Sequence, residues 1–293
     1  MLHAACLAGL NPVALHVDHG IHLESHRWAN ELETTAIALG APFASQRLEG
    51  LHAGMPNLEN AARNARSHAL RELAQAHKAG CILLAHHAND QAETVLLNLL
   101  RGTGLGGVGM PQQRRNDGLI WLRPWLQVPR SDILAYATAH ALQWAEDPSN
   151  EDLALRRNAV RHQLWPVVQA VESRALPSLL RFSSIALEAA QTEQALAAHW
   201  VQGFFQKNGE NPAMEVHHLD WHGMVKDQSI PLQTALLRAW LAMLGCKPPT
   251  QAHAFAMLGQ LNAKTGGGLR CVHEGWAFGF VGEFLQAAPP NRP

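Results

Sequence analysis

Two short apolar segments, each followed at once by a cluster of polar side chains, constrain the fold of this chain more than any other feature. Residues 12–17 (Pro-Val-Ala-Leu-His-Val) are β-prone, and residues 81–85 (Cys-Ile-Leu-Leu-Ala) are apolar on both faces. Strands that are apolar on both faces are typical of buried parallel sheets. The two segments therefore predict an α/β domain with both of them in its core.

Helix-like segments lie between these strands. Residues 24–39 end at Gly40, and residues 57–79 begin at the capping residue Asn57 and stop at Gly80. A short strand is expected at residues 43–47. Alternation of strands and helices predicts a doubly wound, mostly parallel sheet.

The second half of the chain has a different character, which predicts a second, mainly helical domain. We place the first domain at residues 1–165 and the second domain, with a C-terminal hairpin, at residues 166–293. The further expected elements are a helix at 91–101, a glycine-rich loop at 102–109, a helix from 131, Ala/Leu-rich helices at 175–206, 231–244 and 250–261, and a hairpin at 269–281 around Glu274-Gly275.

Composition excludes several classes of protein. Of the 293 residues, 47% are hydrophobic and 16% charged, which excludes a disordered polyelectrolyte and a membrane protein with many spans. The formal net charge of -1 means that a nucleic-acid surface must be a local patch. Residues 61–165 carry 12 Lys or Arg against 9 Asp or Glu, and 11 of those cations are arginine. Arginine suits forked contacts with phosphate, although a solvated face is the competing explanation.

The cysteines and the N-terminal segment bear on the compartment. The four cysteines form no Cys-x-x-Cys pair, no Lys or Arg precedes Arg27, and no run of 18 apolar residues occurs. These features predict a cytoplasmic protein with reduced thiols and no membrane segment. The sequence leaves the oligomeric state open, a homodimer included.

Both predicted strands lead into polar clusters, His16-Val-Asp18-His19-Gly20 and His86-His87-Ala-Asn89-Asp90-Gln91-Ala-Glu93. In open α/β sheets ligands bind beyond the carboxyl ends of the strands, so both clusters are candidate site residues. Asp90 and Glu93 could form a helix capping box, or could bind an ammonium group or Mg²⁺ at the mouth of a pocket.

Other motifs carry less weight. Four histidines at positions 16–26 lack the spacing of a zinc site, so no metal is assigned to histidine. Residues 102–107 match G-x-G-x-x-G, but they follow a helix instead of a strand and are better explained as a loop. Trp121 and Trp125 flank Arg123 and could stack on bases, although core packing is the more ordinary role.

Five blocks of the sequence resemble, in order, the tRNA(Ile)-lysidine synthase family of the PP-loop ATP pyrophosphatase superfamily. They are His16-Val-Asp-His-Gly20, Leu58-Glu-Asn-Ala-Ala-Arg63, the segment from Ala85 to Gly104, Arg123-Pro124-Trp-Leu, and Asp147-Pro-Ser-Asn150 with Arg156-Arg-Asn158. The resemblance implies an adenine nucleotide alpha hydrolase-like sheet. It also implies a ligase that uses ATP and Mg²⁺ to attach free L-lysine to the wobble cytidine of the isoleucine tRNA with anticodon CAU.

The resemblance also assigns roles to residues. Asp90 and Glu93 would hold the incoming lysine, and Arg66 would lie near the nucleotide phosphates. The other positions would contact the nucleotide pocket (His16, Asp18, His19, Gly20, His86 and His87) or the catalytic domain and tRNA (Asp147, Asn150, Arg157, Asn158 and Arg161).

The chain departs from the family pattern in two places. Asn89 replaces a usual Asp, and the Ser-Gly-Gly-x-Asp-Ser loop that cradles the pyrophosphate of ATP does not occur. Residues 2–9 resemble the helix that follows that loop. The backbone amides of the loop would bind the pyrophosphate of ATP, so ATP binding and pyrophosphate release are expected to fail without it. The alternatives are a catalytically inactive tRNA-binding remnant, or a tRNA-thiolating PP-loop relative, which would need paired cysteines.

Overall fold

The computed structural model describes residues 1–18, 20, 25–50, 55, 58–116, 118–145, 148–207, 218–263, 268–282 and 284–289. Its chain forms two compact units. The first contains residues 1–97 and 110–180, and the second contains residues 98–109 and 181–293. The predicted boundary at residue 165 stays a prediction.

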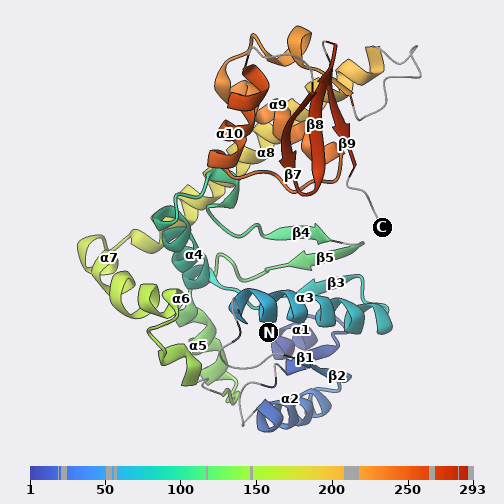
Figure 1. The fold of residues 1–293 in the computed structure, drawn as a ribbon. Coiled ribbons are helices and arrows are strands. Elements are labelled where there is room, and N and C mark those ends of the chain that lie inside the picture. The colour runs from blue at the N-terminus through green and yellow to red at the C-terminus, as the bar shows by residue number, and fades with distance from the viewer. Residues whose placement is uncertain are drawn as a thin grey trace. The chain divides into compact units, whose positions relative to one another are not determined.

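The first unit has the predicted α/β organisation (Figure 1). Its strands are β1 (Ala14–Asp18), β2 (Phe43–Arg47), β3 (Cys81–Leu83), β4 (Gln113–Asn116) and β5 (Leu119–Leu122). Strand β1 pairs with β2 and β3 pairs with β5, both in parallel, whereas β4 pairs antiparallel with β5. The mostly parallel pairing is therefore confirmed, but the described strands form two sheets, β1-β2 and β3-β5-β4, and the second contains an antiparallel hairpin that the sequence analysis missed.

Helices cover both faces of β1. The helices in this part of the chain are α1 (Leu2–Leu7), α2 (Ser25–Ala38), α3 (Leu58–Ala76) and α4 (Ala88–Leu100). Ala14 packs in one cluster with Ala36 of α2, whereas its neighbour Leu15 packs against the cluster that holds Ala74 of α3. Successive residues of a strand point to opposite faces, so α2 and α3 lie on opposite sides of β1. This arrangement is the doubly wound pattern.

Downstream of β5 the first unit is helical. Its elements are α5 (Arg130–Ala139), the turn η2 (Pro148–Glu151), α6 (Arg156–Ala159), the π-helical turn η3 (Val160–Leu164) and α7 (Trp165–Val171). Trp165 is buried against Ala92 of α4 and Ala175. This packing holds α4 against the segment that carries Arg157 and Arg161.

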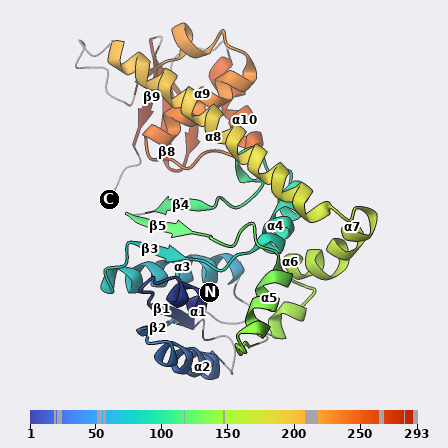
Figure 2. The same ribbon diagram turned by 180° about the vertical axis from the view of Figure 1, so that it is seen from behind.

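The second unit has its own core. The residues expected to form one or two helices make the single helix α8 (Ala175–Lys207), which begins in the first unit, continues into the second and is unbroken in Figure 2. The other elements are the short η1 (Leu105–Gly107), η4 (Trp221–Val225), α9 (Ile230–Met243), α10 (Gln251–Asn262), β6 (His218–Asp220), β7 (Gly268–His273), β8 (Trp276–Val281) and β9 (Phe284–Ala288). The four strands form an antiparallel sheet in the order β6-β9-β8-β7. Trp240 of α9 and Phe278 of β8 are fully buried in this core.

The hairpin of the second unit lies where the sequence predicts it. Strands β7 and β8 pair antiparallel, and both turn residues have positive φ, 50° for Glu274 and 83° for Gly275. Two consecutive residues with positive φ are the requirement of a type I′ turn. Strands β6 and β9, which complete the sheet, were not predicted.

Candidate active site

The end of β1 contributes a buried carboxylate. Asp18 is 6% exposed, and its Oδ1 accepts the backbone N–H of Gly20 at 2.7 Å. Gly20 has φ +68°, a conformation that glycine adopts without strain. Burial lowers the pKa of His16, and its buried Nε2 has no protein partner. His19, also predicted here, lies outside the described residues.

The end of β3 leads through His86 and His87 into α4. The backbone N–H of His87 donates to Asp90 Oδ2 at 3.0 Å, and the backbone N–H of Asp90 donates to His87 Nδ1 at 3.3 Å. These reciprocal bonds close the first turn of α4, as in a capping box. Asp90 therefore caps the helix with His87 as its partner, and Glu93 takes no part in this cap.

Asp90 and Glu93 face two arginines from α6 and η3. Arg157 donates from Nη2 to Asp90 Oδ1 at 2.8 Å and from Nε to Glu93 Oε2 at 3.0 Å. Arg161 donates from Nε to Glu93 Oε1 at 2.7 Å and from Nη2 to Glu93 Oε2 at 3.1 Å. The four side chains form a network of two carboxylates and two guanidinium groups, which we call the α4 ion network.

Burial makes the α4 ion network more than a surface feature. The Glu93 side chain is 4% exposed, and those of Arg157 and Arg161 are 34% and 31% exposed. The hydrogen bond to Glu93 raises the pKa of Arg161 above its ordinary value. Charged partners at such distances hold one another in place, and loss of either leaves a poorly solvated charge.

The segment that carries the two arginines is itself anchored. Asn158 is 5% exposed and donates from Nδ2 to the backbone oxygen of Asp152 at 2.9 Å. The backbone oxygen of Asn150 lies 3.0 Å from His162 Nε2. Asp147, which was predicted in the same block, lies outside the described residues.

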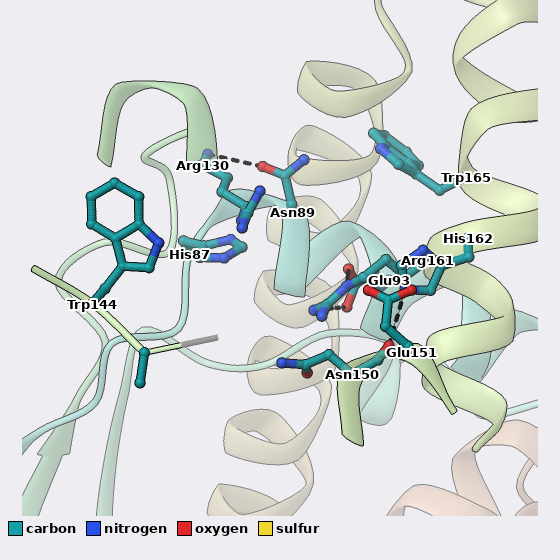
Figure 3. A pocket seen from close by; sticks show the side chains of 11 residues that line it. His87, Asn89, Glu93, Arg130, Trp144, Asn150, Glu151, Arg161, His162 and Trp165 are labelled. Atoms are coloured by element: carbon teal, nitrogen blue, oxygen red, sulfur yellow. Dashed lines mark hydrogen bonds and ion pairs between the residues drawn. The ribbon is translucent and has the colours of Figure 1, made fainter. Parts of the chain in front are cut away.

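A cavity of about 470 Å³ opens beside the α4 ion network (Figure 3). Its charged lining is mixed, with Glu93 and Glu151 against Arg130 and Arg161. The remaining lining residues are His87, Asn89, Trp144, Ala145, Asn150, His162 and Trp165. The Asn89 side chain accepts the backbone N–H of Arg130 at 3.0 Å, so the residue that departs from the family pattern has a structural partner. We call this space the mixed cavity.

A second cavity of about 590 Å³ is lined by five arginines, Arg63, Arg66, Arg71, Arg114 and Arg123, and no carboxylate is among its described lining residues. The lining is completed by Asn64, Ser67, Leu70, Leu84, Ala85, His86, Asn116 and Trp121. Burial lowers the pKa of Arg66, and the charges of Arg63 and Arg157 add to that effect. Burial, with the charge of Arg123 next in size, lowers the pKa of His86 to about 4. We call this space the arginine cavity.

Known proteins match both parts of the chain. The profile of the PP-loop domain matches residues 1–168, and that of the TilS substrate-binding domain matches residues 225–281. The tRNA(Ile)-lysidine synthase of Bordetella pertussis is 36% identical over 277 residues, which cover 89% of this chain and 82% of that protein. The chain belongs to the tRNA(Ile)-lysidine synthase family.

Two further relatives of that name show how much of the family's length is present. The proteins of Ralstonia nicotianae and Xanthomonas axonopodis pv. citri are each 38% identical to this chain, over 266 and 260 residues. The matches cover 89% and 86% of this chain but 54% of each relative. The chain thus spans about half the length of these two members of the tRNA(Ile)-lysidine synthase family.

A solved structure supports the fold. The U34-tRNA thiolase NcsA from Methanococcus maripaludis, with its [4Fe-4S] cluster, superposes with a TM-score of 0.54 over 64% of this chain and 68% of that chain. At 16% identity the similarity extends to the PP-loop fold alone. The four cysteines of this chain are all free thiols: Cys6, Cys81, Cys246 and Cys271.

The described residues offer no ready metal site. Among them, no three His, Cys, Asp or Glu side chains come close enough together to hold a metal ion. The carboxylates of Asp90 and Glu93 face guanidinium groups. These residues do not by themselves fit Mg²⁺. Among the residues that the structure describes, no helix combines the length and the apolar character needed to cross a bilayer.

The structure joins residues that the sequence analysis had assigned to different tasks. Arg157 and Arg161, predicted to contact tRNA, bond directly to Asp90 and Glu93, predicted to hold lysine. Arg130, Trp144 and Glu151 line the mixed cavity but were not predicted as site residues. No motif marks these three; Trp144 and Glu151 lie next to or within the block from Asp147 to Asn158, and Arg130 follows the Arg123-Pro124-Trp-Leu block.

Proposed function

We propose that this protein is an ATP-dependent ligase that attaches lysine to C2 of the wobble cytidine in the isoleucine tRNA with anticodon CAU. The observation that carries the proposal is that two neighbouring residues, His86 and His87, line two different cavities. His86 lines the arginine cavity and His87 lines the mixed cavity. One space suits a polyphosphate, and the other suits a molecule with both positive and negative groups.

The reaction has two steps. The C2 carbonyl oxygen of cytidine attacks the α-phosphate of ATP and pyrophosphate leaves. The ε-amine of lysine then attacks C2 and displaces AMP. A carbonyl oxygen is a poor leaving group, and its conversion to a phosphate ester removes that barrier. The modified base pairs with A instead of G, which changes decoding from AUG to AUA.

We assign the nucleotide phosphates to the arginine cavity, with Arg66 among their ligands. Fixed positive groups stabilise the charge that develops on a departing pyrophosphate. His16, Asp18, His19 and Gly20 remain proposed for the nucleotide side of the site, as do His86 and His87. Mg²⁺, which accompanies ATP in such reactions, also remains a proposal.

We assign lysine to the mixed cavity. Glu93 and Glu151 would attract its ammonium groups, and Arg130 and Arg161 would attract its carboxylate. Glu93 already accepts bonds from both arginines, so the ammonium would join an existing network. Asp90 would act by holding Arg157 and the start of α4 in place. The tRNA itself would meet the exposed arginines of the first unit, and a cytoplasmic location follows from this substrate.

The proposal is tested by release of AMP from labelled ATP in the presence of the tRNA transcript, with and without lysine. The Ser-Gly-Gly-x-Asp-Ser sequence does not occur within residues 1–293, so the assay includes this chain and a version translated from in-frame codons upstream of Met1. We expect lysine-dependent release from a version that carries that loop. Lack of lysine-dependent release from every version would overturn the proposal.

A variant separates the lysine site from the nucleotide site. Asp90→Asn should raise the KM for lysine more than the KM for ATP, with Asp132→Asn on the exposed start of α5 as the matched control. An effect of Asp90→Asn on ATP alone would contradict the role given to the α4 ion network.

A further inference from the structure

Three buried nitrogen atoms without a protein partner belong to residues that line the arginine cavity. They are Nε1 of Trp121, Nε of Arg123 and Nδ1 of His86. Trp121 and Arg123 are each 8% exposed. Buried polar groups are almost always hydrogen-bonded in native proteins, so three such atoms in one cavity need a common explanation.

The positive charge around the arginine cavity indicates that an anion is the missing partner of these nitrogen atoms. In the described part of the chain, Arg63, Arg66, Arg114 and Arg123 form no ion pair with a carboxylate. Burial lowers the pKa of Arg123, and the nearby charges of Arg63 and Arg114 act in the same direction. Clustered cations that repel one another are stabilised by an anion placed among them.

The donors favour phosphate over a simple anion. Trp121 supplies an indole N–H, which can only donate, and Arg123 supplies a planar fork that matches phosphate oxygens. Arg123 is fixed by its Nη1, which donates to the backbone oxygen of Pro111 at 2.8 Å, and its buried Nε has no protein partner. A volume of about 590 Å³ accommodates more than one phosphoryl group.

We propose that Trp121 and Arg123, at the end of β5, are direct ligands of the polyphosphate of the nucleotide. The inference rests on the proposed function, because it takes the nucleotide as the source of the phosphate. Trp121 thus has two tasks, since its ring also packs in the core cluster with Ile82 and Leu119.

The experiment measures binding of sodium pyrophosphate by calorimetry, without lysine or tRNA, both to residues 1–293 and to the version that carries the Ser-Gly-Gly-x-Asp-Ser loop. Trp121→Phe keeps an aromatic ring at this position and removes the indole N–H together with part of the bicyclic ring, and Arg123→Lys keeps the charge and removes the planar fork. We expect each to weaken pyrophosphate binding about tenfold, the effect of one lost hydrogen bond to a charged acceptor. The matched controls, Trp200→Phe and Arg181→Lys on exposed positions of α8, should bind like the parent chain.

A second readout excludes an indirect effect of folding. In a ¹⁵N spectrum, the indole N–H resonance that disappears in Trp121→Phe should shift when pyrophosphate is added to the parent chain. An unchanged resonance together with affinities within twofold of the parent would overturn the proposal, as would no binding at millimolar pyrophosphate. Weaker tRNA binding with unchanged pyrophosphate affinity would also overturn it, because the phosphate would then belong to the RNA.

These results separate the subsite from the proposed function. If pyrophosphate binding depends on Trp121 and Arg123 but lysine-dependent AMP release never occurs, the subsite stands and the ligase proposal fails. If AMP release occurs and neither variant alters pyrophosphate affinity, the ligase proposal stands and the subsite is wrong.

Discussion

At the scale of single residues, Glu93 links the site to stability. It accepts bonds from both Arg157 and Arg161, and it is 3% exposed. Glu93→Gln removes the negative charge and leaves two partly buried guanidinium groups poorly compensated. We expect the free energy of unfolding in urea to fall by about 2 kcal/mol. Glu31→Gln, which disrupts an exposed pair with Arg27, should change it by less than about 0.5 kcal/mol.

The histidine at the border of the arginine cavity predicts a pH dependence. The pKa of His86 is about 4 in the folded chain, mainly because the side chain is buried, against an ordinary value of 6.5. Between pH 6.5 and pH 4 the unfolded chain therefore binds a proton at this histidine that the folded chain does not bind. The free energy of unfolding falls as the pH decreases through this range. His86→Gln should reduce this loss, on the order of 1 kcal/mol after allowance for partial exposure. Urea titrations at a series of pH values measure the difference, and parallel curves for both proteins would contradict it.

At the scale of elements, α4 fixes the backbone before β4. Gln91 is 2% exposed; its Oε1 accepts the backbone N–H of Met110 at 2.8 Å, and its Nε2 donates to the oxygen of Met110 at 3.0 Å. Gln91→Met keeps the length of the side chain but leaves both backbone groups unpaired. We expect a loss of about 2 kcal/mol and faster amide exchange at Met110. Gln75→Met on the exposed face of α3 is the control, and equal effects would show that the paired amide is unimportant.

The elements also show where sequence reasoning succeeds. Strands β1 and β3 were predictable because apolar runs lead into polar clusters, and α3 because Gly80 follows its end. Strand β4 was missed because Gln-Arg-Arg-Asn has no apolar alternation. The Asn-Asp-Gly sequence at 116–118 was an available turn signal, and Gly118 does have φ +83°.

The α4 ion network shows the limit of this reasoning. Asp90 and Glu93 lie one helical turn apart, as do Arg157 and Arg161, so each pair was visible as a pattern of like charges. The two pairs are separated by more than 60 residues along the chain. The packing of Trp165 against α4 helps to bring them together, and no local pattern in one sequence encodes that contact.

At the scale of the whole molecule, a net charge of -1 means that the proposed binding of tRNA would need a local basic surface, and the arginine-rich stretch within residues 61–165 is the candidate. Each phosphate contact releases counterions, so log Kd should change linearly with log salt concentration. Arg115 is exposed on β4 and lines neither cavity. Arg115→Gln should weaken binding of all tRNA sequences alike and reduce the salt slope by about 1. Filter binding at several salt concentrations measures the slope, with Arg181→Gln on α8 as the control. An unchanged slope for Arg115→Gln would place the tRNA on another face of the protein.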